Sequence, residues 1–254
     1  MKPHGAGRDR RPVLCALFAI VLAACHGGPV RKAAAPAVSG LVVAREGAMD
    51  YGLYVPAVAD ANRNLPLVLY LHGFTEKPLA NQPWQVEALQ KLETCFVLIP
   101  TCPEDQGASA WGGTYDADLR PSMVTVLALL DRIVQERPVD PARVYVYGGS
   151  MGGEGVFMLL AKEPDRFAGA ISVAGYTLEK GADAMARTPL WILHGSADTV
   201  NATDSSRKIY AAIQAAGGTR VRYTEYPGVD HMTIWDLVRR EPDLLDWLLA
   251  QRRP

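Results

Sequence analysis

The sequence has little of three things: cysteine, histidine and net charge. Four cysteines in 254 residues are too few for a scaffold held together by disulfides. The five histidines are scattered, and no cysteine–histidine pair has the spacing of metal ligands, so no metal site is expected. A formal net charge of −1 gives no basic surface that would indicate nucleic-acid binding. The hydrophobic fraction of 49%, by contrast, is enough for a substantial core, which excludes a disordered chain.

The first 24 residues have the pattern of an export signal. Residues 1–12 carry four basic side chains and one acid, and the apolar run 13–24 that follows is too short to cross a bilayer as a helix. The run ends in Leu-Ala-Ala, and Cys25 comes next. This order of segments resembles the signal of bacterial lipoproteins, which implies that residues 1–24 are removed and that the Cys25 thiol is acylated, for example with palmitate. Ordinary secretion, with Cys25 incidental, and twin-arginine export, suggested by Arg10 and Arg11, are the alternatives.

Loss of this segment would change the charge of the chain. It would remove four basic residues and one acidic residue, leaving 22 basic and 26 acidic residues and a net charge of −4. The stretch after Cys25, up to residue 39, is rich in Gly, Ala and Pro, as in a flexible tether. Residues 40–254 then have the size of a single domain. We therefore expect a cell-envelope lipoprotein held to a membrane by its lipid, on the outer membrane or at the periplasmic face, since His26 rather than aspartate follows the cysteine.

From residue 41 onward, short apolar segments alternate with segments of helical periodicity. Strands are expected at 41–45, 49–55, 67–71, 96–99, 143–147, 170–173, 190–193 and 221–226, and helices at 122–135, 153–161, 203–216 and 234–251. The first two strands are expected to pair antiparallel. Strands separated by helices predict an α/β fold, a mostly parallel, doubly wound sheet with helices on both faces. Functional residues are then expected beyond the carboxyl ends of the strands.

The strand at 143–147 is followed by Gly-Gly-Ser-Met-Gly-Gly, which contains the pattern Gly-x-Ser-x-Gly with Ser150 at its centre. Between a strand and a helix, this pattern is typical of a nucleophile elbow, where small neighbours let a serine adopt a strained conformation. The other interpretation is a phosphate-binding turn, but the lysine of such a loop and the Gly-x-Gly-x-x-Gly pattern are both missing. Ser150 is therefore the predicted nucleophile.

A serine hydroxyl needs a base to take its proton. In hydrolases with this elbow, an acid and then a histidine follow the serine along the chain, and only His231 satisfies that order. Two acids compete to orient it. Asp198 follows the strand at 190–193, whereas Asp230 is the neighbour of His231 in the chain, where two side chains seldom face each other. Asp198 is the predicted acid, with the task of fixing the tautomer of the imidazole.

The reaction also needs donors for an oxyanion. One is predicted to be the backbone N–H of Met151, directly after the serine, and the other that of Phe74, in the turn after the strand at 67–71. Thr75 is the alternative to Phe74. His72 begins the same turn and is expected to hold it by a hydrogen bond.

Two tryptophans and two cysteines have less definite roles. Trp111 and Trp235 are candidate walls of the substrate pocket, although core packing is an equal alternative for Trp111 and the favoured one for Trp235. Cys95 and Cys102 flank the strand at 96–99. A disulfide between them would therefore require the chain to reverse sharply after Pro100.

These residues together resemble the α/β-hydrolase superfamily, in particular extracellular esterases of the feruloyl-esterase, polyhydroxybutyrate-depolymerase and "predicted peptidase" kind. The resemblance runs through residues 65–73, 143–153, 164–168, 189–195 and 223–231. It implies one α/β-hydrolase domain without a large lid and a serine hydrolase of carboxylic esters that forms an acyl-enzyme and needs no cofactor. The substrate would be a small-molecule or polymer ester with a short-chain or aromatic acyl group. A serine peptidase of the prolyl-oligopeptidase type and a non-catalytic binding protein on the same scaffold are the alternatives.

Overall fold

A computed structural model describes residues 40–56, 64–81, 83–103, 111–112 and 118–254. The expected signal at 1–24, Cys25 and the tether up to residue 39 lie outside these ranges. The described residues all belong to one structural unit, Ala34–Pro254. None of the helices among them is long and apolar enough to span a membrane.

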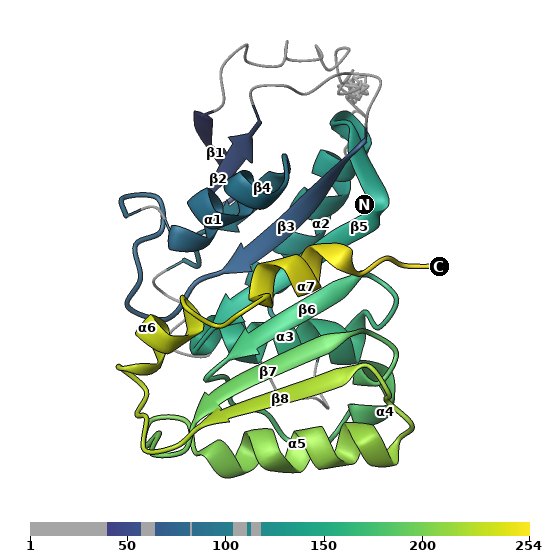
Figure 1. Ribbon diagram of the computed structural model, residues 1–254. Helices are drawn as coiled ribbons and strands as arrows, with labels where there is room; N and C mark the ends of the chain where they lie inside the picture. The colour runs from purple at the N-terminus through teal and green to yellow at the C-terminus, as the bar shows by residue number, and fades with distance from the viewer. Residues whose placement is uncertain (1–39, 57–63, 82, 104–110, 113–117) are drawn as a thin grey trace, which may run out of the picture. The chain divides into compact units, whose positions relative to one another are not determined.

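The described part is built on a sheet of eight strands in the order β1-β2-β4-β3-β5-β6-β7-β8 (Figure 1). The strands are β1 (Gly40–Glu46), β2 (Met49–Val55), β3 (Leu65–Leu71), β4 (Phe96–Pro100), β5 (Val139–Gly149), β6 (Gly169–Val173), β7 (Leu190–Gly195) and β8 (Val221–Tyr226). β1 and β2 pair antiparallel, as expected, and β2 pairs antiparallel with β4. All pairs from β4 to β8 are parallel, which confirms the predicted fold class.

Helices cover both faces of this sheet. They are α1 (Trp84–Leu92), α2 (Pro121–Glu136), α3 (Met151–Lys162), α4 (Ala182–Met185), α5 (Thr203–Ala215), α6 (Ile234–Val238) and α7 (Leu244–Ala250). Successive side chains of a strand point to opposite faces. In β3, Leu67 and Leu69 therefore join a core with residues of α2, α3 and α5, whereas Val68 and Tyr70 join a second core with residues of α1, α6 and α7. β3 is buried along its whole length because it is covered on both sides.

The expected helix at 234–251 is wrong in one respect, because the structure divides it into α6 and α7. Pro242 lies between them. A proline lacks the N–H that a helix needs and disfavours the helical conformation of the residue before it. Asp243 then takes a left-handed conformation with φ of 59° before α7 begins. Two further helices, α1 and the single-turn α4, were not among the expected elements.

Parallel strands bring their carboxyl ends to a common edge of the sheet. The turns after β3, β5, β7 and β8 therefore meet at the same edge, although they are far apart in the sequence. These turns carry Phe74, Ser150, Asp198 and His231, respectively. The fold thus gathers the residues that the sequence analysis selected.

Candidate active site

Ser150 lies in a sharp turn between β5 and α3. Its φ of 53° and ψ of −118° belong to a strained region of backbone conformation. A β-carbon on Gly148 would lie 2.2 Å from the carbonyl oxygen of Gly152, and one on Gly152 would lie 1.9 Å from that of Leu71. The turn therefore closes only with glycine at both positions, which is the physical meaning of the Gly-x-Ser-x-Gly pattern.

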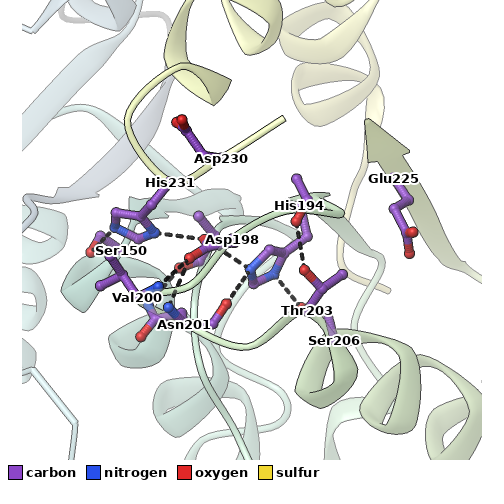
Figure 2. A network of polar contacts seen from close by, with 12 residues as sticks. Ser150, His194, Asp198, Val200, Asn201, Thr203, Ser206, Glu225, Asp230 and His231 are labelled. Atoms are coloured by element: carbon purple, nitrogen blue, oxygen red, sulfur yellow. Dashed lines mark hydrogen bonds and ion pairs between the residues drawn. The ribbon is translucent and has the colours of Figure 1, made fainter. Parts of the chain in front are cut away.

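The Ser150 hydroxyl points to the ring of His231 (Figure 2). The distance from its Oγ to Nε2 of His231 is 2.9 Å, and Nδ1 of the same ring lies 2.6 Å from Oδ2 of Asp198. A carboxylate can only accept, so Nδ1 carries the proton of the neutral ring and Nε2 is free to accept the serine proton. Only 7% of the surface of His231 and of Asp198 is exposed, so these contacts are shielded from water.

The Asp198 carboxylate is held by the turn in which it lies. Its Oδ1 accepts the backbone N–H groups of Val200 and Asn201, both at 2.8 Å. Its Oδ2, which contacts His231, also lies 3.1 Å from Nε2 of His194. The contact partner of His231 is therefore Asp198, which the sequence analysis preferred over its chain neighbour.

Asp230 has a different position. Its Oδ1 accepts the backbone N–H groups of Met232 and Thr233 and the Thr233 hydroxyl, at 2.8–2.9 Å. These hydrogen bonds, those of Thr233 first, lower the pKa of the Asp230 carboxyl. Asp230 thus stabilises the turn that carries His231 and points away from the imidazole (Figure 2).

The turn after β3 is fixed by His72, as expected. Its Nδ1–H donates to the carbonyl oxygen of Gly73 at 2.7 Å, and its Nε2 accepts the backbone N–H of Cys102 at 3.0 Å. Burial lowers the pKa of His72, which keeps the ring neutral as this bonding requires. The turn therefore presents the backbone of Phe74 and Thr75 in a fixed orientation.

Phe74, Thr75 and Met151 line one pocket of about 670 Å³. Met151 is the first residue of α3, so its N–H has no partner within the helix and points to the helix N-terminus. The predicted donors thus border a common space next to the Ser150 turn. The wall of that space comes from residues 75–80 and 101–103, together with Asp50. Apart from Thr75, these residues were not predicted to line a pocket, because no local pattern marks a loop that does so.

Trp111 is not a wall of this pocket, and that prediction is wrong. Its side chain is fully buried, its Nε1–H donates to the carbonyl oxygen of His72 at 3.0 Å, and its ring packs edge-on against the His72 ring. It supports the turn after β3 from within. Trp235 is also absent from the pocket lining and is half-buried, with its ring edge-on to His231. A β-carbon on Gly149 would lie 2.8 Å from that indole, so Trp235 packs on the elbow.

The disulfide considered for Cys95 and Cys102 does not form: both side chains are buried and neither is part of a disulfide. The strand β4 separates them and holds the chain extended. Burial raises the pKa of the Cys95 thiol to about 12. Among the residues that the structure describes, no group of three or more His, Cys, Asp or Glu side chains could hold a metal ion.

Comparison with known proteins decides the family. A family model described as "alpha/beta hydrolase fold" matches residues 66–208, which is more than half of the chain. The chain belongs to the α/β-hydrolase family. The matched segment contains Ser150 of the elbow, whereas His231 lies beyond its end.

Several known proteins are similar to this α/β-hydrolase in sequence or structure. It is 28% identical over 161 residues to a bifunctional acetylxylan esterase/xylanase of Neocallimastix patriciarum, and 29% identical over 126 residues to poly(3-hydroxyalkanoate) depolymerase C of Paucimonas lemoignei. These matches cover 61% and 48% of this chain, but only 22% and 30% of the relatives. Among solved structures, a thermostable esterase superposes with a TM-score of 0.70 at 25% identity, over 85% of this chain and 63% of that one.

Proposed function

We propose that this α/β-hydrolase cleaves carboxylic esters, with Ser150 as nucleophile, His231 as general base and Asp198 as the acid that orients the imidazole. The observation that carries the proposal is the continuous hydrogen-bonded path from Ser150 through His231 to Asp198, with distances of 2.9 and 2.6 Å. The names of its relatives add support, since an acetylxylan esterase and a thermostable esterase are among them.

The proposed reaction has two stages. His231 takes the proton of the Ser150 hydroxyl at Nε2 while Oγ bonds to the carbonyl carbon of the ester. The tetrahedral intermediate then breaks its bond to the alcohol oxygen, which receives the proton from His231 and leaves. Water attacks the resulting acyl-enzyme by the same route and releases the carboxylic acid. Asp198 does not take the proton, and it stabilises the imidazolium that forms in each stage.

The oxyanion of each intermediate would accept the N–H groups of Met151 and of Phe74, with Thr75 as the alternative to Phe74. Met151 contributes the free N–H of the first turn of α3, where the helix dipole favours negative charge. Loss of one such donor raises the barrier by about 3 kcal/mol in enzymes of this type.

The pocket that these donors border suits a short-chain or aromatic acyl group. Its volume of about 670 Å³ has room for one ring, and Pro78, Leu79 and Met151 contribute apolar walls. Exposed apolar side chains also gather on the turns at this edge of the sheet: Phe74, Tyr176, Leu178, Val200 and Met232. They favour a substrate with an apolar body, either a small molecule or a polymer.

The test is turnover of p-nitrophenyl acetate and butyrate by the protein and by Ser150→Ala. We expect the variant to lose at least about 1,000-fold in kcat. Ser205→Ala is the matched control, because Ser205 is a buried serine whose hydroxyl has no hydrogen-bond partner among the described residues. Equal turnover by the wild type and Ser150→Ala would refute the assignment.

Two further measurements separate the alternative functions. A fluorophosphonate probe is expected to label the wild type and Ser205→Ala but not Ser150→Ala. Labelling that persists in Ser150→Ala would identify a different serine, and no labelling of any variant would favour a binding protein. Faster cleavage of peptide p-nitroanilides than of the esters would favour a peptidase.

We also propose that the chain is a lipoprotein of the cell envelope, with its lipid on Cys25. The support is the order of basic, apolar and Leu-Ala-Ala-Cys segments at the N-terminus. Cys25→Ala is expected to move the protein from the membrane fraction to the soluble fraction and to abolish labelling with radioactive palmitate. Cys15→Ala, which changes a cysteine inside the expected signal, is the control. Membrane association that survives Cys25→Ala would exclude acylation as the anchor.

A further inference from the structure

Asp198 is in contact with two histidines. On one side, Nδ1 of His231 lies 2.6 Å from its Oδ2, and on the other side, Nε2 of His194 lies 3.1 Å from the same oxygen (Figure 2). The second histidine comes from the end of β7, four residues before Asp198. Its side chain and that of the aspartate are fully buried. The reaction proposed above gives this second imidazole no role.

The contacts of His194 determine its tautomer. Its Nε2 faces two acceptors, the Asp198 carboxylate and the carbonyl oxygen of Asn201 at 2.9 Å, so Nε2 must carry a proton. Its Nδ1 lies 2.7 Å from the hydroxyl of Ser206, which donates to it. Burial lowers the pKa of His194, so the ring is neutral and Nδ1 remains an acceptor. Ser206, on α5 and itself fully buried, thus fixes the ring in one orientation.

From these contacts we infer that His194 is a positioning residue for the proposed reaction: locked by Ser206, it holds the Asp198 carboxylate in place and draws off part of its negative charge. The inference rests on the proposed function. The effect of His194 reaches Ser150 through Asp198 and then His231. Among the described residues, His194 contacts neither Ser150 nor the pocket.

Two consequences follow from sharing one oxygen. The carboxylate is held at both ends, with Oδ1 on two backbone N–H groups and Oδ2 on two imidazoles, so it cannot rotate away from His231. A donor on Oδ2 also competes with His231 for the negative charge. Loss of His194 would therefore loosen the carboxylate and, at the same time, leave more charge for the imidazolium of His231. The first effect lowers the rate, and the second moves the acid limb of the kcat/KM profile to higher pH.

The charged groups on β8, on α5 and in the His231 turn keep their charge over the pH range of such a profile. Glu154, in the first turn of α3, has a pKa raised to about 7 by burial, but it is present in all the variants compared and so does not account for a difference between them. Glu225 pairs with His194 across β7 and β8, and its bonds to Arg207 and Tyr223 lower its pKa to about 2. Arg207, on α5, remains positive. On the other side of Asp198, the hydrogen bonds from Thr233 and Met232 lower the pKa of Asp230, so that it is ionised as well. A shift of the acid limb would then report on His231 and its contact with Asp198.

The test compares His194→Leu, which removes the donor, with His194→Gln, whose Nε2 can reach the same acceptors. We measure kcat/KM for p-nitrophenyl acetate between pH 5 and 9, and the low-field proton resonance of His231 Nδ1–H by NMR. For His194→Leu we expect the plateau to fall about tenfold or more, the acid limb to rise by about half a pH unit, and the resonance to move further downfield. His194→Gln is expected to restore all three.

Two serines on one helix give a matched pair. Ser206→Ala removes the hydrogen bond that orients the His194 ring, so we expect smaller changes in the same directions as for His194→Leu. Ser205→Ala, which removes the neighbouring buried hydroxyl, is expected to leave the rate, the limb and the resonance unchanged. If His194→Leu does not fold, Ser206→Ala and His194→Gln carry the test.

The outcomes separate the two proposals. A wild type without Ser150-dependent turnover refutes the proposed function, and the NMR resonance then decides whether His194 acts on the Asp198–His231 contact. The wild type can be active while neither His194→Leu nor Ser206→Ala moves the acid limb of the kcat/KM profile or the His231 Nδ1–H resonance. That result would overturn the positioning role alone. A fall in rate that His194→Gln does not restore also overturns it, because general damage to packing would then be the cause.

Discussion

The Nδ1 of His231 lies 2.6 Å from Oδ2 of Asp198, although the two residues are 33 positions apart in the chain. β7 and β8 are neighbouring parallel strands, and the turns that follow them bring the two side chains together. Each turn is stabilised independently, that of Asp198 by the backbone of Val200 and Asn201, and that of His231 by Asp230.

This arrangement predicts different results for the two aspartates. Asp198→Asn keeps the shape but loses the charge and favours the wrong tautomer of His231, so kcat should fall about 1,000- to 10,000-fold. Asp230→Asn retains an oxygen for Met232 and Thr233, and kcat should stay within about threefold of the wild type. Steady-state kinetics with p-nitrophenyl acetate measures both. Similar losses in the two variants would contradict the assignment of the acid.

The pocket predicts a change in acyl selectivity. Thr101 lines it with a hydroxyl that is buried and has no hydrogen-bond partner among the described residues. Thr101→Phe should fill part of the space, lowering kcat/KM for an aromatic acyl ester about tenfold or more and that for the acetate by less than about threefold. Thr219→Phe, on a loop away from the pocket, is the control. Equal losses on both esters would mean that the acyl group binds elsewhere.

The glycines of the elbow predict a loss of stability. A β-carbon on Gly152 would meet the backbone of Leu71 at 1.9 Å, and backbone cannot yield as a flexible side chain does. Gly152→Ala should therefore lower the free energy of unfolding by more than about 3 kcal/mol. A β-carbon on Gly217 would have open space around it, and only the positive φ of this residue opposes the substitution. Gly217→Ala should therefore lower the free energy of unfolding by about 1 kcal/mol. Urea denaturation gives both values, and equal effects would argue against the tight contact.

Glu154, in the first turn of α3, predicts a pH-dependent stability. Burial raises its pKa from 4.5 to about 7, so the folded protein holds this proton at pH values where the unfolded chain has lost it. The contribution of Glu154 to the free energy of unfolding should therefore fall as the pH rises from about 4.5 to 7 and then level off. Glu154→Gln should be more stable than the wild type by about 1 kcal/mol at pH 8, after allowing for partial exposure to solvent, and equally stable at pH 4.

Urea denaturation at both pH values measures this difference. Glu179→Gln, at an exposed glutamate, is the control and should show no pH-dependent gain. A gain for Glu154→Gln that is the same at pH 4 and pH 8 would exclude titration of the carboxyl as its cause.

The strands and the elbow were predictable because their signals are local. A strand covered on both faces, such as β3, is apolar along its length, and the glycines around Ser150 are required by contacts within a few residues or with the adjacent strand. The helix at 234–251 was predicted too long for a local reason as well, since the effect of Pro242 was given too little weight against the apolar periodicity.

The sequence by itself determined the α/β class, the position of the elbow and the order of serine, acid and histidine, since each depends on periodicity, on the steric needs of a turn or on chain order. Only the tertiary structure decided that Trp111 supports His72 from within, 39 positions away, and that His194 shares the carboxylate of Asp198. These outcomes depend on which turns meet at the edge of the sheet. The order of the strands in the sheet determines which turns lie side by side, and hydrophobic periodicity carries no information about that order.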